Sequence, residues 1–231
     1  MIRLDKYLAD MGCGTRQEVK KFIRSGQVSV DGIVVKKPET KVEQTVQEVF
    51  LNGEKVGYES FEYYMLNKPA GVISATEDQG CQTVVDLIKD KKRKDLFPVG
   101  RLDKDTEGLL LITNDGALAH RLLSPKKHVD KCYFARICGK VTEEDVRSFE
   151  KGVNIGSQEQ PEITMPGKLE IITSDDISKI RLTIQEGKFH QVKRMFQAVG
   201  KEVIYLKRLR MGTLILLSLI HISEPTRLGM I

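Results

Sequence analysis

The sequence predicts an α+β protein in which a small N-terminal unit of helices and a hairpin precedes a larger domain of strands and helices. Near the N-terminus, apolar residues recur at helical spacing and are followed by Asp31-Gly32, a pair typical of tight hairpin turns. Further along, short apolar segments bounded by glycine or turn residues alternate with amphipathic stretches, which indicates a sheet flanked by helices. The 231 residues, 40% of them hydrophobic, suffice for one or two domains.

Two helices and a hairpin are predicted first along the chain. Apolar residues at helical spacing predict a helix over residues 3–11, which Gly12 ends. A second helix begins at Thr15, which forms a capping box with Glu18, and it ends at Gly26. Its outward face is basic, and residues 28–35 then form the hairpin.

Residues 100–116 place a short acidic turn between two predicted strands, residues 97–102 and 109–113. In this turn Asp103 follows Arg101, and a guanidinium beside the carboxylate would keep the acid ionised and fix its position. An ionised, oriented carboxylate can act as nucleophile or base, so the turn is the candidate active site. The alternative interpretation is a connection whose aspartate and threonine only cap the backbone.

The other predicted elements alternate between strands and helices. They are strands 61–66, 72–75, 131–139, 168–173 and 179–185, and helices 83–89, 117–123, 142–151 and one that opens at residue 186. The last helix has an inward stripe of Phe189, Val192, Phe196 and Val199 opposite a basic face. Strand 131–139 lacks a clean polar alternation, so we expect it to be covered on both faces.

Positive charge is distributed unevenly along the chain. The net charge is +5, but residues 1–37, 120–140 and 186–210 each carry an excess of four or five positive charges. If the fold brings these stretches onto one face, that face would attract phosphates. Charge runs are more often solvated surface, and the basic run at residues 91–94 stays unassigned.

Composition also bounds the chemistry. The four cysteines form no Cys-x-x-Cys pair, and the four histidines are scattered, so we expect no metal site. No apolar run follows the initiating methionine, which argues against a signal peptide and favours a cytoplasmic protein. We expect a monomer that does not bind membranes.

Three motifs carry a resemblance. The first is Gly100-Arg101-Leu102-Asp103 with Thr106 and residues 108–116, the second is Lys131-x-Tyr133 with Gly139, and the third spans residues 186–196. Together they resemble the pseudouridine synthases, and most of all the branch that acts on small-subunit ribosomal RNA. The resemblance implies a catalytic domain with a mainly antiparallel, mixed β-sheet flanked by helices, and it implies no cofactor.

The same resemblance assigns roles to residues of the motifs. Asp103 would be the catalytic carboxylate, Lys193 and Arg101 would hold it ionised, and Tyr133 would lie against a flipped-out base. Making pseudouridine breaks the N1 to C1′ bond of uridine, turns the uracil and joins C5 to C1′. The sequence leaves open whether the carboxylate adds to the sugar, adds to C6 of the base or removes the 2′ proton.

The N-terminal stretch resembles the small RNA-binding module named after ribosomal protein S4. The resemblance rests on residues 3–8, on Thr15-Arg16 and on residues 26–32. It implies that the second helix and the hairpin contact RNA. With the basic residues around the catalytic motifs, the candidate RNA-binding residues are Arg3, Lys6, Arg16, Lys20, Arg24, Gln27, Lys131, Lys188, Gln191 and Arg194.

We therefore predict an S4-like domain at residues 1–57, a catalytic domain at residues 61–212 and an atypical tail at residues 213–231. The tail carries a mostly apolar run at residues 214–222, too short to span a membrane, which suggests a frame shift or foreign sequence. The expected partner is ribosomal RNA, as a small-subunit precursor or assembly intermediate. The main alternative is a noncatalytic RNA-binding or ribosome-assembly factor, and a carboxylate hydrolase ranks third because no second acid stands in a motif.

Overall fold

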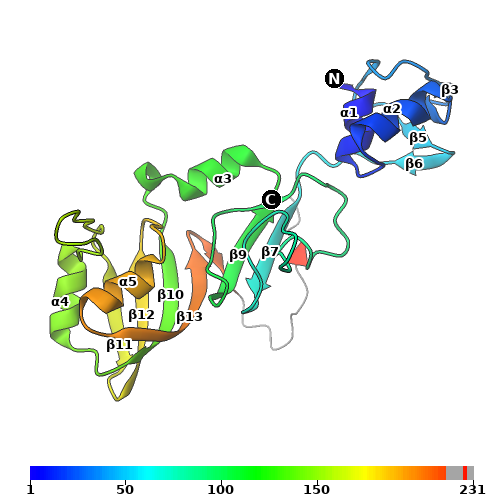
Figure 1. Cartoon of the computed structure of the whole chain (residues 1–231). Coiled ribbons are helices and arrows are strands. Elements are labelled where there is room, and N and C mark those ends of the chain that lie inside the picture. Colours follow the sequence, from blue (N-terminus) through cyan, green and yellow to red (C-terminus); the bar gives the residue numbers. More distant parts are fainter. Residues whose placement is uncertain (217–225, 228–231) are drawn as a thin grey trace. The chain divides into compact units, whose positions relative to one another are not determined.

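The computed structural model describes residues 1–216 and 226–227, and the chain divides into two compact units (Figure 1). The first unit consists of Met1–Glu62 with Lys89–Leu96, and the second of Tyr63–Ile88 with Phe97–Ile231. The basic run that the sequence left unassigned therefore belongs to the N-terminal unit. Arg93 anchors it, because its buried guanidinium lies 2.6 Å from Asp95 and 3.5 Å from Asp10.

The N-terminal unit packs two helices against a small antiparallel sheet of order β3-β2-β5-β6. Its elements are β1 (Ile2–Arg3), α1 (Leu4–Asp10), α2 (Arg16–Arg24), β2 (Val28–Val30), β3 (Ile33–Val34), β4 (Lys41–Val42), β5 (Val49–Leu51) and β6 (Glu54–Val56). The predicted capping box is present, since Thr15 and Glu18 exchange backbone and side-chain hydrogen bonds. The hairpin is present too: Asp31 and Gly32 have φ of 50° and 80°, as a two-residue turn of this kind requires.

The second unit is built on one mixed sheet of order β11-β12-β10-β13-β9-β7-β15. Its elements are β7 (Tyr63–Lys68), β8 (Phe97–Pro98), β9 (Glu107–Thr113), α3 (Gly116–Leu123), a 3-10 turn (Pro125–Lys127), β10 (Lys131–Cys138), α4 (Glu143–Lys151), β11 (Lys168–Thr173), β12 (Ile177–Ile184), α5 (Gln191–Ala198), β13 (Glu202–Met211), β14 (Leu214–Ile215) and β15 (Thr226–Arg227). Among the described strands only β13 and β9 pair in parallel, so the predicted α+β fold with a mainly antiparallel mixed sheet is confirmed.

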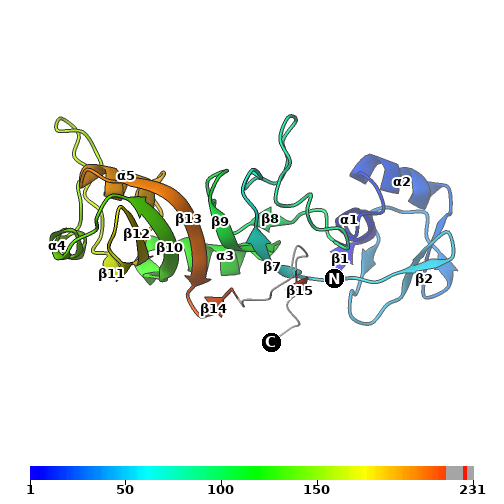
Figure 2. The ribbon, with the colours of Figure 1, turned by 90° about the horizontal axis from the view of Figure 1, so that it is seen from below.

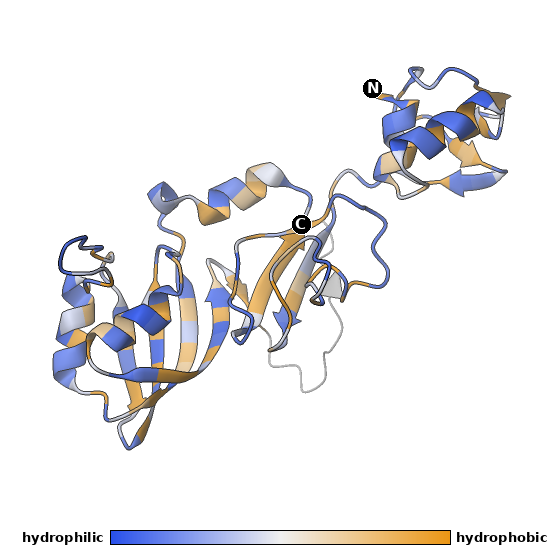
Figure 3. Cartoon of the chain, viewed as in Figure 1, coloured by the Kyte–Doolittle hydropathy of each residue, from blue (hydrophilic) through white to orange (hydrophobic). Residues whose placement is uncertain are grey.

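Helices α4 and α5 lie beside the β11 to β13 part of the sheet, as Figures 1 and 2 both show. The rings of Phe149 and Phe196 join the two helices at 4.9 Å between their centroids. Strand β9 is almost wholly apolar and buried, and Figure 3 shows its hydrophobic colour. Strand β10 lies between β12 and β13, as expected of an interior strand, but Arg136 and Cys138 are exposed, so only its first part is covered on both faces.

Four local predictions differ from the structure. Residues 72–75 form no strand, and only Ile73 makes an isolated bridge, to Thr83. Residues 83–89 form turns rather than a helix, because Val84, Val85 and Ile88 are all buried and the segment packs as a compact connection. The strand predicted at residues 97–102 shortens to Phe97–Pro98, since the chain leaves the sheet to form the acidic turn. The last helix begins at Gln191, five residues later than expected.

The start of the atypical tail is part of the fold. Strand β14 pairs with β13, and Leu214 and Leu216 pack against the buried cluster that contains Leu109 and Met211. Strand β15 pairs with β7. The rest of the tail, residues 217–225 and 228–231, lies outside the described residues, so its suspected foreign origin stays a prediction. No helix in the described part of the chain is long and apolar enough to cross a membrane.

Candidate active site

The acidic turn is fastened to the sheet by Lys68, the last residue of β7. Its side chain is fully buried, and its ammonium group donates to the main-chain oxygens of Pro69, Asp103, Lys104 and Thr106 at 2.8 to 3.2 Å. Burial lowers the pKa of Lys68 to about 8, against the opposing effect of nearby carboxylates. This lysine joins four carbonyl groups of the turn and of the end of β7, two of which also accept from main-chain N–H groups, and so fixes the main chain that carries Asp103.

Two further contacts place the turn. The hydroxyl of Ser74 donates to the oxygen of Leu102 at 2.9 Å and accepts from its N–H at 3.0 Å. At Gly108 the chain passes so close to β13 that a Cβ atom would lie 2.2 Å from the oxygen of Arg208. Only glycine permits this approach, which brings the turn next to the strand that forms part of the pocket.

The four residues predicted to be catalytic line one cavity. Asp103 and Arg101 come from the turn, Tyr133 from β10 and Lys193 from α5, and the cavity they share measures about 70 Å³. Tyr133 is 7% exposed, so its ring forms a wall of the cavity. Segments that are far apart in the sequence therefore meet at Asp103.

Lys193 contacts the Asp103 carboxylate. Its ammonium lies 3.4 Å from Asp103 Oδ2 and 2.7 Å from Asp105 Oδ1. Partial burial lowers the pKa of Lys193, but the hydrogen bond that it donates to Asp105 and the charges of both acids outweigh burial and raise the pKa. The hydrogen bond from Lys193 in turn lowers the pKa of Asp105. The lysine therefore stays charged between two carboxylates.

His190 is a site residue that sequence reasoning missed. Its Nε2 lies 3.5 Å from Asp103 Oδ1, whereas Lys193 contacts Oδ2 of the same carboxylate. It precedes α5 with a φ of 47°, the left-handed region that few residues other than glycine adopt. Its position inside the third motif was the available signal.

The expected pairing of Asp103 with Arg101 is not formed within the described part of the chain. Lys193 and His190 occupy the two carboxylate oxygens, and the Arg101 side chain stays exposed at the cavity. The cation that holds Asp103 therefore comes from α5 and not from the preceding strand. Arg101 lines the pocket but does not pair with Asp103, as the sequence had suggested it would.

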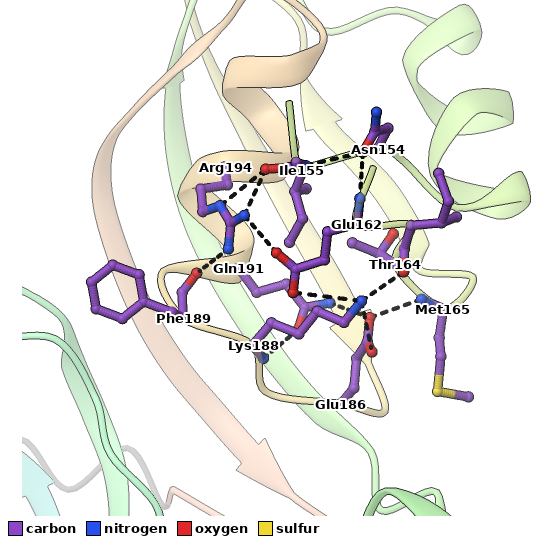
Figure 4. A network of polar contacts seen from close by, with 12 residues as sticks. Asn154, Ile155, Glu162, Thr164, Met165, Glu186, Lys188, Phe189, Gln191 and Arg194 are labelled. Carbon is purple, nitrogen blue, oxygen red and sulfur yellow. Dashed lines mark hydrogen bonds and ion pairs between the residues drawn. The ribbon is translucent and has the colours of Figure 1, made fainter. Parts of the chain in front are cut away.

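A polar network holds the loop before α5 (Figure 4). Gln191 is 4% exposed; its amide donates to Glu186 Oε1 at 2.8 Å, and its oxygen accepts from the N–H of Lys188 at 2.9 Å. Arg194 donates to the oxygens of Ile155 and Phe189. It also pairs with Glu162 at 2.6 Å, while Lys188 donates to Ile163.

These contacts bear on two of the candidate RNA-binding residues. Gln191 is buried in the network although it lines the cavity, and Lys131 is 5% exposed with its ammonium directed at the oxygen of Val129 at 3.1 Å. Their burial limits access for a phosphate, and both stay predictions as RNA contacts. Lys188 and Arg194 remain partly exposed and stay predictions.

The predicted contacts of the N-terminal unit lie at its surface. Lys6, Arg16, Arg24 and Gln27 are exposed and Lys20 is half-buried. Arg3 pairs with Asp5 at 2.9 Å, a contact that raises the pKa of Arg3. All six stay predictions as RNA contacts. Among the described residues no cluster of His, Cys, Asp and Glu could hold a metal ion.

Comparisons with known proteins agree with the motifs. A family model described as RNA pseudouridylate synthase matches residues 62–198, and an S4 domain matches residues 2–47. A protein named uncharacterized RNA pseudouridine synthase YtzG from Bacillus subtilis is 53% identical over 91% of this chain and 88% of its own length. Ribosomal large subunit pseudouridine synthase B of the same organism is 42% identical, covering 90% and 84%.

Two further matches reach the same family. Ribosomal small subunit pseudouridine synthase A of Vibrio cholerae is 39% identical over 93% of this chain and 90% of its own length. A crystal structure of a pseudouridylate synthase matches with a TM-score of 0.67 at 34% identity, covering 99% of this chain and 96% of the other. The fold, the pocket and these matches define an RNA-modifying isomerase with a separate RNA-binding unit. The chain belongs to the RNA pseudouridine synthase family and carries an S4 domain.

Proposed function

We propose that this protein converts a specific uridine of small-subunit ribosomal RNA into pseudouridine, with Asp103 as the catalytic carboxylate. The observation that carries the proposal is the cavity in which the Asp103 carboxylate, the Lys193 ammonium and the Tyr133 ring meet. A small, partly apolar pocket of this kind accepts a single base that has left the RNA helix.

The pocket residues divide the work of the reaction. Tyr133 offers a flat surface to the flipped uracil, and Lys193 and His190 contact the two oxygens of Asp103 and orient it. An ionised carboxylate in this position acts as nucleophile or base while the N1 to C1′ bond breaks. When C5 joins C1′, the hydrogen on C5 leaves as a proton and N1 takes one up, so the base changes neither composition nor charge.

The small-subunit assignment is supported by Leu123-Ser124-Pro125 before the second motif and by relatives named small subunit synthases. A relative named for the large subunit is 42% identical, which makes large-subunit RNA the second candidate substrate. The substrate is either free precursor RNA or an assembly intermediate, and the enzyme works as a monomer in the cytoplasm.

Carbodiimide modification followed by primer extension tests this proposal, because it maps pseudouridine to single nucleotides. Purified protein is incubated with unmodified transcripts of both ribosomal RNAs and with partly assembled small subunits. We expect one new stop, in the small-subunit RNA or its assembly intermediate, and no stop with Asp103→Asn. A stop found only in the large-subunit transcript would reject the small-subunit assignment.

A further inference from the structure

Phe189 is an exposed aromatic side chain directly before His190, which lines the pocket. The sequence places it in the inward stripe of the last helix, but its side chain is 75% exposed. It precedes the N-cap residue of α5, where an apolar side chain often packs against the first turn of the helix. Its exposure excludes that structural role and leaves one face of an aromatic ring open to solvent close to the pocket.

The ring is stacked on His190. Their centroids lie 3.8 Å apart with an angle of 19° between the planes, which is close to parallel. His190 lines the cavity, and its Nε2 lies 3.5 Å from Asp103. The two rings therefore form one continuous stack that starts beside the catalytic carboxylate and ends in solvent at the outer face of Phe189.

Hydrogen bonds from Arg194 and Gln191 hold the loop that carries the stack. The oxygen of Phe189 accepts from Arg194 at 3.1 Å, and Gln191 closes the same loop through Glu186 at 2.8 Å (Figure 4). Figure 4 shows the Phe189 ring pointing away from this network. The network thus fixes the main chain of Phe189 and the stack with His190 supports its ring, so the platform exists before any ligand arrives.

We infer that the Phe189–His190 stack binds an unpaired nucleobase of the RNA, the neighbour of the target uridine. This inference rests on the proposed function. Bases stack on aromatic side chains whatever their sequence, and an unpaired neighbour held in this way keeps the target out of the helix. Lys188 and Lys193 lie in the same pocket lining, and their positive charges suit the phosphates on either side of such a base.

Fluorescence of 2-aminopurine tests the inference, because its emission falls when the base stacks on an aromatic ring. The probe is a single-stranded RNA nonamer with a central uridine and 2-aminopurine on one side or the other. It is titrated with wild type, Phe189→Leu and Phe189→Trp. Ile172→Ala is the control, since Ile172 is also an exposed apolar residue, 49% exposed on β11, and lies outside the pocket lining.

We expect quenching at one of the two positions with wild type, Phe189→Trp and the Ile172 control. Phe189→Leu keeps an apolar side chain but loses the flat face, so quenching disappears and affinity for the nonamer falls about tenfold. Quenching and affinity equal to wild type in Phe189→Leu would overturn the inference, and so would an absence of quenching with wild type.

Two further measurements separate the stacking role of Phe189 from a purely structural role and from the proposed function. Thermal melts of Phe189→Leu should match wild type because the ring is mostly exposed, and a lowered melting temperature would make Phe189 a structural residue and overturn the inference. Tritium release from ribosomal RNA is measured on the wild type alone. If it fails while the quenching pattern holds, the proposed function falls but the stacking platform stands.

Discussion

The cations of α2 in the N-terminal unit and the buried cations of the catalytic sheet are used in opposite ways. In the N-terminal unit, Arg16 and Arg24 are exposed on α2, where RNA can reach them. In the catalytic unit, Lys68, Lys131 and Arg208 are 0%, 5% and 2% exposed, and the first two direct their ammonium groups at main-chain oxygens. The comparison teaches that burial decides whether a cation binds RNA or holds the protein together, although the local charge excess is similar in both units.

The largest effect on stability is expected at Lys68. Lys68→Met removes a shared donor from four main-chain oxygens, of which those of Asp103 and Lys104 keep a main-chain N–H, so we expect a loss of about 3 kcal/mol in the free energy of unfolding. Urea denaturation measures it. Lys104→Met is the matched control, since Lys104 is an exposed lysine of the same turn. Equal losses in the two variants would show that burial does not separate the two classes of cation.

The effect of Lys68 on stability should depend on pH, which gives a second test of the contrast between buried and exposed cations. Its pKa of about 8 in the folded protein lies below the ordinary 10.5, so between these values the unfolded chain binds more protons. Stability therefore rises with pH over this window, and the contribution of Lys68 becomes more favourable from about pH 8 to about pH 10.5. Urea denaturation over this pH range should show the free energy of unfolding of the wild type rising relative to that of Lys68→Met. A constant difference would place the folded pKa at its ordinary value.

A moderate effect on binding is expected in the N-terminal unit. Replacing Arg16 and Arg24 by glutamine should weaken RNA binding and lower the slope of log affinity against log salt by about 1 to 2. Thermal stability should not change, because both side chains are exposed. Lys55→Gln is the control, since its ammonium is already paired with Glu48. An unchanged slope in the double variant would remove α2 from the RNA contact.

The smallest effect is expected at Lys131. Lys131→Met keeps the length of a buried side chain and gives up the hydrogen bond to Val129, so the free energy of unfolding should change by about 1 kcal/mol or less. Burial lowers the pKa of Lys131, which means that the charged ammonium is disfavoured in this place. Replacing it with an uncharged side chain therefore costs less free energy of unfolding. The salt slope of RNA binding should stay at the wild-type value. A slope lower by about 1 would make Lys131 a phosphate contact.

The sequence predicted the parts of the fold that local chemistry decides. The capping box of Thr15 and Glu18 and the hairpin at Asp31-Gly32 depend on neighbours within a few residues, and both are confirmed. The site could be assembled only because the motifs resembled a known family. Asp103 and Lys193 are ninety residues apart in the sequence, and no local pattern joins them.

What sequence analysis missed depends on contacts over long distances in the chain. Lys68 has three of its four acceptors in the turn beyond residue 100, so its role could not be seen from its own neighbourhood. Phe189 fitted the helical stripe, but the network around Gln191 keeps it in a loop before the helix starts. Charge counting likewise could not separate buried Lys131 from exposed Arg16.

The central claim is that Asp103 performs chemistry, and Asp105 offers a matched control. Both acids lie in the same turn and contact Lys193, at 3.4 Å and 2.7 Å, but only Asp103 lines the cavity. Asparagine keeps the size of either side chain and removes its charge. In Asp103→Asn this takes away the nucleophile or base, whereas in Asp105→Asn it takes away only one partner of Lys193.

The measurement is tritium release from ribosomal RNA labelled at C5 of uridine, with RNA affinity and thermal melts recorded on the same preparations. Asp103→Asn should release no tritium while its affinity and melting temperature stay near those of wild type. Asp105→Asn should keep a rate within about tenfold of wild type, since a positioning charge is worth less than the reacting group. Release by Asp103→Asn at the wild-type rate would contradict the account and remove Asp103 from the mechanism.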